Sequence, residues 1–138
     1  AWIASHWFSL AGINTTTHIA IIEKYNFLST TDSYLISKKH LGTRLDLLEI
    51  DKKSSLLIVN KITAFFKRLA WIGFSHGDAK SSNFFLADNK LFTFDLDIAK
   101  KQTLKRLMRS SVSKDKKRIV KSFEDNKQIS SLLSKRLN

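Results

Sequence analysis

Apolar residues recur every three or four positions in the middle of the chain, and this period predicts a long helix buried on one side. Ser54 or Ser55 is suited to cap the start of this helix, and Gly73 is suited to end it. The periodic positions are Ile58, Ile62, Phe65, Phe66, Leu69 and Ile72. Because the helix leads directly into the polar segment that begins at His76, we expect it to hold that segment rigidly.

Shorter patterns before this helix predict another helix and a pair of strands. Residues 1–11 carry apolar side chains at helical spacing, so they are predicted to be helical. Residues 17–25 and 33–38 are rich in β-branched side chains and are separated by a polar turn, which predicts two antiparallel strands. Residues 44–50 are predicted to form a short helix.

Two short apolar runs after the polar segment predict a β-hairpin. The runs are residues 83–86 and 91–94, and the turn-rich residues 87–90 join them. Such a hairpin would bring Asp95 close to Asn83, although twelve positions separate the two residues. The last quarter of the chain is basic and carries a sparse apolar stripe at helical spacing. The predicted fold class is therefore α+β and mainly helical.

Length and composition indicate one domain, or one lobe of a larger domain. The chain has 138 residues, of which 43% are hydrophobic, and this excludes wholesale disorder. The absence of cysteine excludes disulfides and thiolate metal sites, and a reducing cytoplasm is the expected compartment. The apolar runs are far shorter than the roughly 20 residues that span a bilayer. Trp2, Trp7 and Trp71 are expected to fill the core.

The formal net charge of +12 indicates an anionic partner, which the charge leaves open as nucleic acid, an anionic bilayer surface or a phosphorylated substrate. The cations concentrate between residues 100 and 121. Asp115 is the only acid between Asp97 and Glu124. A basic run of this kind is typical of a solvated helix face, and the shortage of acids adds a preference for an anionic surface or substrate.

The residues with the most chemical meaning lie in the segment HGDAKSSN, residues 76–83, and in the DLD that follows the hairpin. Asp78 is suited to orient an attacking hydroxyl, and Lys80 to neutralise charge on a transferred phosphoryl group. Asn83 and Asp95 offer the hard oxygen ligands that Mg²⁺ prefers beside phosphate. HGD alone is typical of a solvated polar loop. All four groups at these offsets favour a phosphotransfer site.

Neighbouring polar residues receive structural or open assignments. His76 is expected to brace the loop by hydrogen bonding to nearby backbone or to the segment around Asp95. Asp97 either assists Asp95 at the metal or caps a helix that begins near Ile98. The remaining histidines stand singly, without a second ligand at metal spacing, and are expected to be structural: His6, His18 and His40.

The pattern HGDxKxxN, followed by a hairpin and Asp-Leu-Asp, resembles the C-terminal lobe of the protein-kinase-like fold, where the motifs are written HRDxKxxN and DFG. HGD and the final Asp look most like the lipopolysaccharide kinase family, whose members phosphorylate Kdo or heptose of the inner core. Residues 5–15, 33–42 and 106–123 also resemble segments of that family, so the resemblance covers nearly the whole chain. The aminoglycoside and choline phosphotransferases are similar, though less so.

The resemblance implies roles for the polar residues and two cofactors, ATP and Mg²⁺. By resemblance, Asp78 would be the catalytic base and Lys80 a phosphate contact. Asn83 and Asp95 would be the Mg²⁺ ligands.

The resemblance also implies a division into lobes within a single partial domain. Residues 1–37 would be a remnant of the N-terminal lobe, residues 38–42 the hinge, and residues 43–138 the C-terminal lobe. The backbone from Lys38 to His40 would line the adenine pocket. The Gly-rich loop and the strand lysine of the fold are absent. The chain as given is therefore expected to have little or no kinase activity and to expose unpaired strand edges.

The expected function is ATP-dependent phosphorylation of a sugar hydroxyl of the lipopolysaccharide inner core, on Kdo or heptose. The expected acceptor is the core glycolipid. The expected location is the cytoplasm, peripheral at the inner membrane of a Gram-negative bacterium, where the anionic surface would attract the basic residues. Nucleic acid is not the expected partner. The alternatives are a small-molecule or protein kinase of the same fold, and a non-catalytic basic module that binds an anionic membrane surface or nucleic acid.

Overall fold

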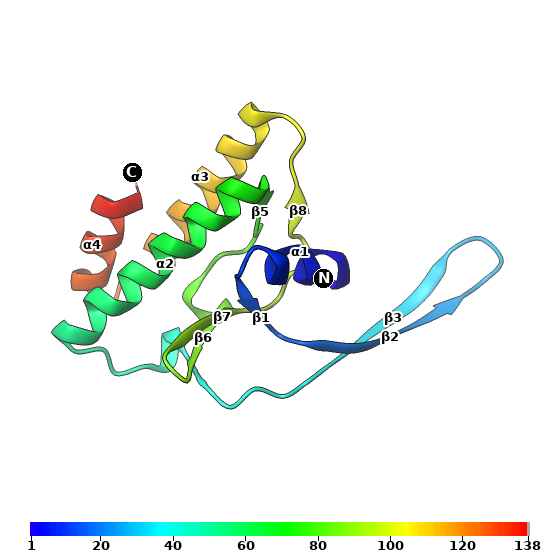
Figure 1. The fold of residues 1–138 in the computed structure, drawn as a ribbon, viewed down its shortest axis with the longest axis horizontal. Helices are drawn as coiled ribbons and strands as arrows, with labels where there is room; N and C mark the ends of the chain where they lie inside the picture. Colours follow the sequence, from blue (N-terminus) through cyan, green and yellow to red (C-terminus); the bar gives the residue numbers. More distant parts are fainter. Residues whose placement is uncertain (138) are drawn as a thin grey trace.

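The computed structural model describes residues 1–137 as a group of helices packed on small sheets, with one long hairpin extending to the side (Figure 1). Asn138, the last residue of the predicted C-terminal lobe, lies outside the described residues. The predicted α+β class is confirmed. In chain order the elements are α1 (Trp2–Leu10), β1 (Asn14–Thr15), β2 (His18–Tyr25), β3 (Thr30–Ser37), β4 (Thr43–Arg44), the 3-10 helix η1 (Leu45–Leu47), α2 (Lys52–Ile72), β5 (Phe74–Ser75), the 3-10 helix η2 (Ser81–Asn83), β6 (Phe84–Ala87), β7 (Lys90–Thr93), β8 (Lys100–Lys101), α3 (Lys105–Lys121) and α4 (Lys127–Leu137).

Helix α2 is the predicted long helix, and it ends as the sequence indicates. Gly73 adopts the left-handed conformation with φ 73°, which a residue with a side chain rarely takes. The predicted N-cap at Ser54 or Ser55 is wrong. Asp51 is the N-cap, since its carboxylate accepts a 2.7 Å hydrogen bond from the backbone N–H of Ser54. Because Asp51 reaches this amide, the helix starts earlier than the apolar period suggested.

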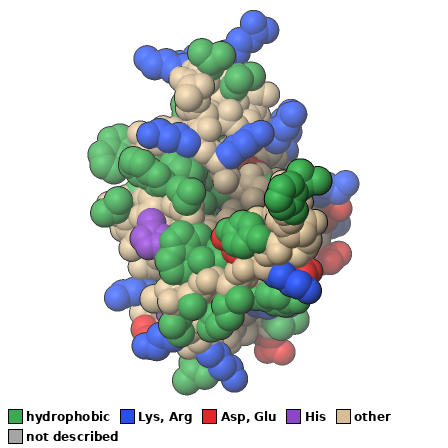
Figure 2. Space-filling view, turned by 90° about the vertical axis from the view of Figure 1, so that its right-hand side faces the viewer, with side chains coloured by type: hydrophobic (Ala, Val, Ile, Leu, Met, Phe, Trp, Pro, Cys, Tyr) green, Lys and Arg blue, Asp and Glu red, His purple; other side chains and the backbone are tan. Residues whose placement is uncertain are grey.

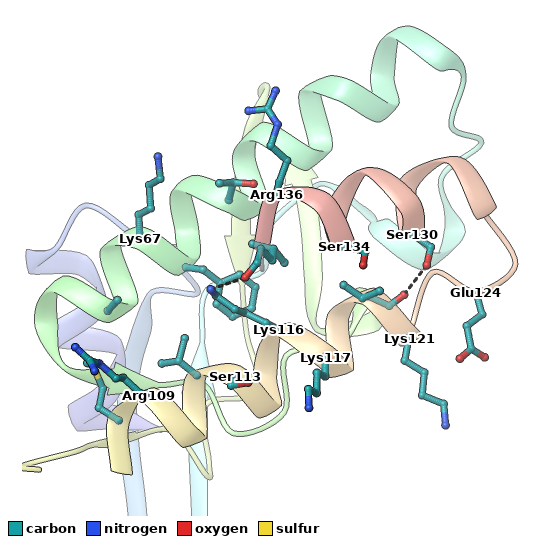
Figure 3. Close-up of a pocket in the computed structure, with 17 residues that line it drawn as sticks. Lys67, Arg109, Ser113, Lys116, Lys117, Lys121, Glu124, Ser130, Ser134 and Arg136 are labelled. Carbon is teal, nitrogen blue, oxygen red and sulfur yellow. Dashed lines mark hydrogen bonds between the residues drawn. The ribbon is translucent and has the colours of Figure 1, made fainter. Parts of the chain in front are cut away.

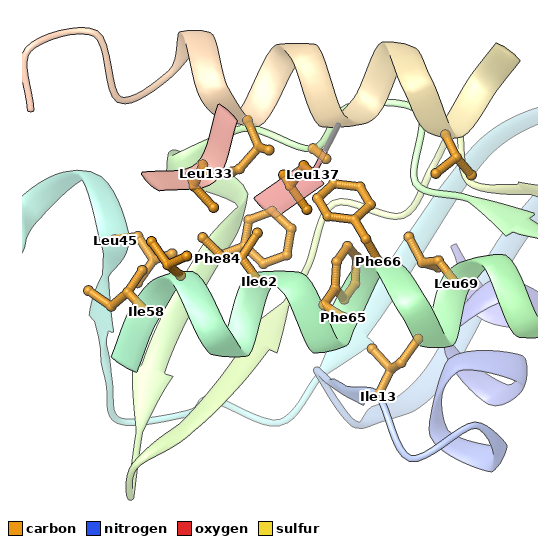
Figure 4. Packing of buried hydrophobic residues seen from close by; sticks show 14 of the residues in the cluster. Ile13, Leu45, Ile58, Ile62, Phe65, Phe66, Leu69, Phe84, Leu133 and Leu137 are labelled. Carbon is orange, nitrogen blue, oxygen red and sulfur yellow. The ribbon is translucent and has the colours of Figure 1, made fainter. Parts of the chain in front are cut away.

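The buried side of α2 forms the centre of the core (Figure 4). Phe65 packs edge to face on Phe84 of β6, with ring centroids 5.0 Å apart. On the side of the C-terminal helices, Leu133 and Leu137 of α4 belong to the same buried cluster. The helix that precedes the polar loop and the hairpin that follows it are therefore joined by direct side-chain packing.

The prediction that the tryptophans fill the core is wrong, because none of the three belongs to the buried cluster. The side chain of Trp71 is 79% exposed, because it lies two positions, or about 200°, beyond the buried Leu69 on the helix. Trp7 is 40% exposed and packs beside Phe74, with the Nζ of Lys101 4.4 Å from its ring centroid. The smaller Ile, Leu and Phe side chains fill the core instead.

The hairpin β6–β7 is confirmed, with the tightest possible connection. Ala87 pairs with Lys90, so only Asp88 and Asn89 form the turn, and both have positive φ (47° and 55°). Two positive φ angles are typical of the type I′ turn, for which Asp and Asn are favoured. The hairpin is the centre of a four-stranded sheet in the order β1-β7-β6-β4.

The predicted antiparallel pair is also confirmed as β2 and β3, which form the long hairpin at the side of the molecule (Figure 1). Within residues 1–137 neither strand pairs with a third one. The tip is fully exposed at Phe27 and Leu28. Figure 2, which views the molecule from the side toward which this hairpin extends, shows hydrophobic side chains gathered on that face.

Two predicted helices differ from the structure. Residues 44–50 contain the end of β4 and the 3-10 turn η1 in place of an α-helix. No helix begins near Ile98: Asp97 and Ile98 form a turn, β8 follows, and α3 starts at Lys105. Asp97 therefore caps no helix. The basic C-terminal helices are confirmed as α3 and α4. None of the helices in the described part of the chain has the length and apolarity needed to cross a membrane.

Candidate active site

The polar loop between β5 and β6 and the segment after β7 bring together the four side chains that the sequence singled out. Asp78 is in the middle. Its Oδ2 lies 2.8 Å from the Nζ of Lys80 and accepts a 3.0 Å hydrogen bond from the Nδ2 of Asn83. The same Nδ2 lies 3.3 Å from the Oδ2 of Asp95. The hairpin thus closes the gap of twelve positions between Asn83 and Asp95, as expected.

Asp95 is held in an unusual backbone conformation. Its φ of 58° is in the left-handed region, which is uncommon for a residue other than glycine. The backbone N–H of Phe94 donates to the carbonyl of Asn83 at 3.1 Å and fixes the two ends of the hairpin to each other. Strained residues that the surrounding structure holds in place cluster at functional sites. The hairpin therefore positions the Asp95 carboxylate at the loop.

Electrostatics keep Asp78 ionised. The hydrogen bond from Lys80 lowers the pKa of the Asp78 carboxyl below its ordinary value, and Asn83 and the guanidinium of Arg118 lower it further, while partial burial opposes them. At neutral pH Asp78 is therefore a carboxylate, and it is able to accept a hydrogen bond from a substrate hydroxyl.

His76 braces the loop, as expected. The side chain is fully buried, and its Nε2 lies 2.7 Å from the Oγ1 of Thr93 on β7. Its Nδ1 accepts a 3.3 Å hydrogen bond from the backbone N–H of Asp78, so Nε2 carries the proton and donates it to Thr93. Burial lowers the pKa of His76 to about 4, and the ring is neutral at pH 7. It links the loop to the hairpin rather than transferring protons.

Asp115 of α3 holds the backbone of the loop, and the sequence reasoning missed this role. Its carboxylate is almost completely buried and accepts hydrogen bonds from the backbone N–H groups of His76 (2.8 Å) and Gly77 (3.1 Å to each oxygen). Burial raises the pKa of Asp115, and the N–H donors and Arg118 oppose that shift. A signal was present: Asp115 is the only acid of α3 and shares a helical face with the buried Val112 and Ile119.

Two more residues on this side of α3 contact the loop. The Nη1 of Arg118 donates to the backbone carbonyl of Gly77 and lies 3.5 Å from the Oδ1 of Asp78. After the helix ends, the Oγ of Ser122 accepts a 2.8 Å hydrogen bond from the backbone N–H of Ser81. Positions 115, 118 and 122 follow the helical period, so one face of α3 supports the whole loop.

Gly77 is required at its position by close packing. Its φ is 87°, and a Cβ there would lie 2.8 Å from both the Cγ1 and the carbonyl oxygen of Ile98. Only glycine lets the segment after Asp95 approach the loop this closely. Gly77 thus allows the HGDAKSSN loop and the segment that carries Asp95 to pack against each other.

Asn83 and Asp95 are suited to hold Mg²⁺. Both short contacts of Asn83 with Asp78 use Nδ2, at 2.8 Å to the backbone oxygen and 3.0 Å to Oδ2, so the amide oxygen is the atom left for a cation. Among the described residues no cluster of three or more His, Cys, Asp or Glu side chains would hold a metal. A carboxylate and an amide oxygen are sufficient for Mg²⁺ where phosphate oxygens and water complete the coordination.

Comparison with known proteins identifies a solved structure with the same fold as this chain. No protein-family model matches the chain, and no curated protein matches it. A solved structure of WaaP in complex with acyl carrier protein matches 98% of this chain with a TM-score of 0.76 and 16% sequence identity. This chain shares its fold with WaaP. At this level of identity the similarity shows the fold alone. The chain spans 63% of the length of that WaaP chain.

The two residues predicted at the adenine pocket lie after β3, in a segment that begins beside Thr17, the residue before β2. The backbone N–H of Lys38 donates to the carbonyl of Thr17 at 2.8 Å. The ring of His40 packs on the hairpin of the WaaP-like fold, with its centroid 5.1 Å from that of Phe92 and 5.9 Å from that of Phe85. The segment therefore contacts the strand that leads to Asp95. Its contact with a nucleotide stays a prediction.

A separate cavity of about 780 Å³ lies between α2, α3 and α4 (Figure 3). None of its lining residues belongs to the loop or the hairpin. Its apolar lining residues are Phe66, Ala70, Met108, Val112, Val120 and Leu137, and its cations are Lys67, Arg109, Lys116, Lys117, Lys121 and Arg136. The Nζ of Lys116 donates to the carbonyl of Leu137 at 2.6 Å and links α3 to the end of α4. The cavity thus combines an apolar lining with positive charge.

Proposed function

We propose that this chain is the main part of an ATP-dependent kinase that phosphorylates a sugar hydroxyl of the lipopolysaccharide inner core, on Kdo or heptose. One observation carries the proposal. Lys80 and Asn83 both contact Asp78, and Asn83 also contacts Asp95, in a fold shared with the core kinase WaaP. A phosphotransfer site needs a carboxylate for the acceptor, a cation for the phosphoryl group and hard ligands for Mg²⁺.

In the proposed mechanism Asp78 accepts a hydrogen bond from the acceptor hydroxyl and receives its proton. The hydroxyl oxygen forms a bond to the γ-phosphorus as the bond from that phosphorus to the bridging oxygen breaks, and ADP leaves with the electron pair. Lys80 neutralises charge on the transferred group, and Asn83 and Asp95 would hold Mg²⁺. When bound, the cation would neutralise charge on the phosphates.

We propose the same division into lobes as the resemblance implied. Residues 1–37 belong to the N-terminal lobe and residues 38–42 form the hinge, where the backbone of Lys38 and His40 contacts adenine. Residues 43–138 form the C-terminal lobe. The chain spans 63% of the length of that WaaP chain. Little or no activity is expected of the 138 residues alone, so the experiments below use the protein from its complete gene.

The proposed acceptor sets the proposed location, which is the cytoplasmic face of the inner membrane of a Gram-negative bacterium. The net charge of +12 and the basic helix α3 support contact with an anionic surface there. Phosphate transfer to the core glycolipid in isolated inner membranes, described in the Discussion, tests acceptor and location together.

Replacing Asp95 with asparagine is expected to weaken Mg-ATP binding by about tenfold or more, since a neutral amide replaces the charged oxygen ligand. Asp88→Asn is the matched control. Asp88 lies in the same hairpin, also has positive φ and is exposed at the turn, and asparagine tolerates that conformation. Isothermal titration with Mg-ATP should separate the two variants. Equal affinities of wild type and Asp95→Asn would exclude Asp95 as a ligand.

We also propose acyl carrier protein as a partner, because WaaP was solved in complex with it. The cavity between α2, α3 and α4 supports this, since its apolar lining suits an acyl chain and its cations suit anionic groups of a carrier. Acylated carrier protein is expected to raise the melting temperature, whereas the carrier without an acyl chain is not. Equal effects of the two forms would contradict a role for the cavity.

A further inference from the structure

We propose that Arg118 recognises an anionic group of the acceptor, a carboxylate or a phosphate located next to the hydroxyl that is phosphorylated. The inference rests on the proposed kinase function and adds a requirement on the substrate. It follows from where Arg118 lies relative to Asp78, and from how weakly the two side chains are joined.

The two oxygens of Asp78 face different partners. Oδ2 is the oxygen in contact with Lys80 and Asn83, and Asn83 in turn contacts Asp95, so this is the side of the metal and the nucleotide. Oδ1 is the oxygen nearest Arg118 of α3. In phosphoryl transfer the attacking and leaving oxygens are roughly in line on opposite sides of phosphorus. The acceptor therefore approaches Asp78 on the side away from Asp95, where Arg118 lies.

Arg118 is accessible to a ligand and is only weakly bound to Asp78. Its side chain is 45% exposed, whereas that of Asp115 beneath the same loop is 2% exposed. The 3.5 Å between its Nη1 and the Oδ1 of Asp78 is longer than the roughly 2.8 Å of a charge-assisted hydrogen bond. The contacts that it makes with other described residues use Nη1, and a guanidinium has five N–H donors. Donors thus remain for a ligand.

The charges around Arg118 favour an anion. Lys114 lies one turn earlier on α3 and is exposed, which extends the positive charge along the helix. Asp115 is the only acid of α3, and its carboxylate is turned under the loop to the amides of His76 and Gly77. The guanidinium fork matches carboxylate and phosphate oxygens in bidentate geometry. A neutral sugar offers no anionic group to this fork, and Arg118 would then keep only its contact with Asp78.

Binding of the anion also prepares the base. When Arg118 binds the anionic group through its remaining donors, that group shares the positive charge that otherwise faces the Oδ1 of Asp78, and Oδ1 accepts the hydrogen bond of the substrate hydroxyl. Lys80 stays on Oδ2 at 2.8 Å, beside the transferred phosphoryl group. Arg118 would thus select an anionic acceptor next to Oδ1, the oxygen of Asp78 that receives the proton of the hydroxyl.

The test compares two pairs of water-soluble acceptors on the protein from its complete gene. One pair is a Kdo methyl glycoside and its carboxamide, and the other is a heptose carrying phosphate and the same heptose without it. In one of the two pairs, we expect the kcat/KM of wild type to be about tenfold to a hundredfold higher for the anionic sugar than for its neutral form. Arg118→Gln should remove this preference by raising the KM for the anionic sugar. The KM for ATP should stay within about twofold.

Two further variants separate charge, geometry and folding. Arg118→Lys keeps the charge but loses the fork, so it should recover part of the preference. Lys135→Gln removes one exposed cation from α4 and should behave as wild type. The melting temperature of each variant is measured in parallel. Recovery by lysine is not expected if Arg118 only braces the loop through the carbonyl of Gly77.

The outcomes distinguish the two proposals. Transfer to all four sugars with the same ratios in wild type and Arg118→Gln overturns the role of Arg118 and leaves the kinase function standing. A lower melting temperature with equal losses on charged and neutral sugars also overturns it. No transfer by wild type to any of the four sugars overturns the proposed function and this inference with it. The pair that shows the preference identifies the anion as carboxylate or phosphate.

Discussion

Asp78→Asn is expected to lower kcat by about 10³-fold, a typical size for the loss of a general base. An amide has nearly the same shape as the carboxylate but does not take up the proton of the acceptor hydroxyl. Affinity for Mg-ATP should change by no more than about threefold, since the proposed metal ligands Asn83 and Asp95 are untouched. The measurement is ATP-dependent phosphate transfer to core lipopolysaccharide in isolated inner membranes by the protein from its complete gene.

Asp125→Asn is the matched control for this substitution. Asp125 is an exposed acid between α3 and α4, and its replacement removes the same charge outside the loop. The control should label the glycolipid at the wild-type rate. Equal labelling by Asp78→Asn and wild type would rule out the proposed mechanism. No labelling by wild type in the isolated inner membranes would contradict the proposed acceptor and location.

Asp115→Ala is expected to destabilise the protein by about 3 kcal/mol, because it leaves buried N–H groups of the loop without an acceptor. Asp78 lies one residue beyond Gly77, whose amide would be released, so its carboxylate would lose its position. Displacement of a catalytic group by about 1 Å costs about a hundredfold in rate. Urea unfolding and the transfer assay measure the two effects.

Amide hydrogen exchange tells a loop defect from a general loss of stability. Asp115→Ala should speed exchange at His76 and Gly77 more than at the core of α2. Val112→Ala is the control, because Val112 is buried on the same face of α3 one turn earlier and its removal leaves the loop amides bonded. Unchanged protection of the two loop amides in Asp115→Ala would show that other groups hold the loop.

Local signals in the sequence were sufficient where neighbours along the chain decide the structure. The period of three and four residues and Gly73 predicted the body and the end of α2. Turn residues between two apolar runs predicted the hairpin β6–β7, and the hairpin alone implied that Asp95 meets Asn83. These predictions held because a helix face and a tight turn are determined within about ten residues.

Signals of the same kind were insufficient where competing groups lay close together. Asp51 took the cap that Ser54 or Ser55 was predicted to provide. Asp97 was interpreted as a possible helix cap, but the next residue, Ile98, packs against Gly77 and the chain continues into β8. The exposure of Trp71 depended on which side of α2 faces other elements. In each case a contact with a distant or rival group outweighed the local preference.

The sequence by itself determined the residues that meet at the candidate site: the HGDAKSSN loop, the helix that leads into it and the hairpin that returns Asp95. Only the tertiary structure decided which side chains of α3 hold the loop, since Asp115 and Arg118 are more than 35 positions away in the sequence. No local pattern shows which face of a basic helix is turned toward a loop. That orientation is set by burial of Val112 and Ile119 in the shared core, and the same rotation carries Asp115 beneath the loop amides.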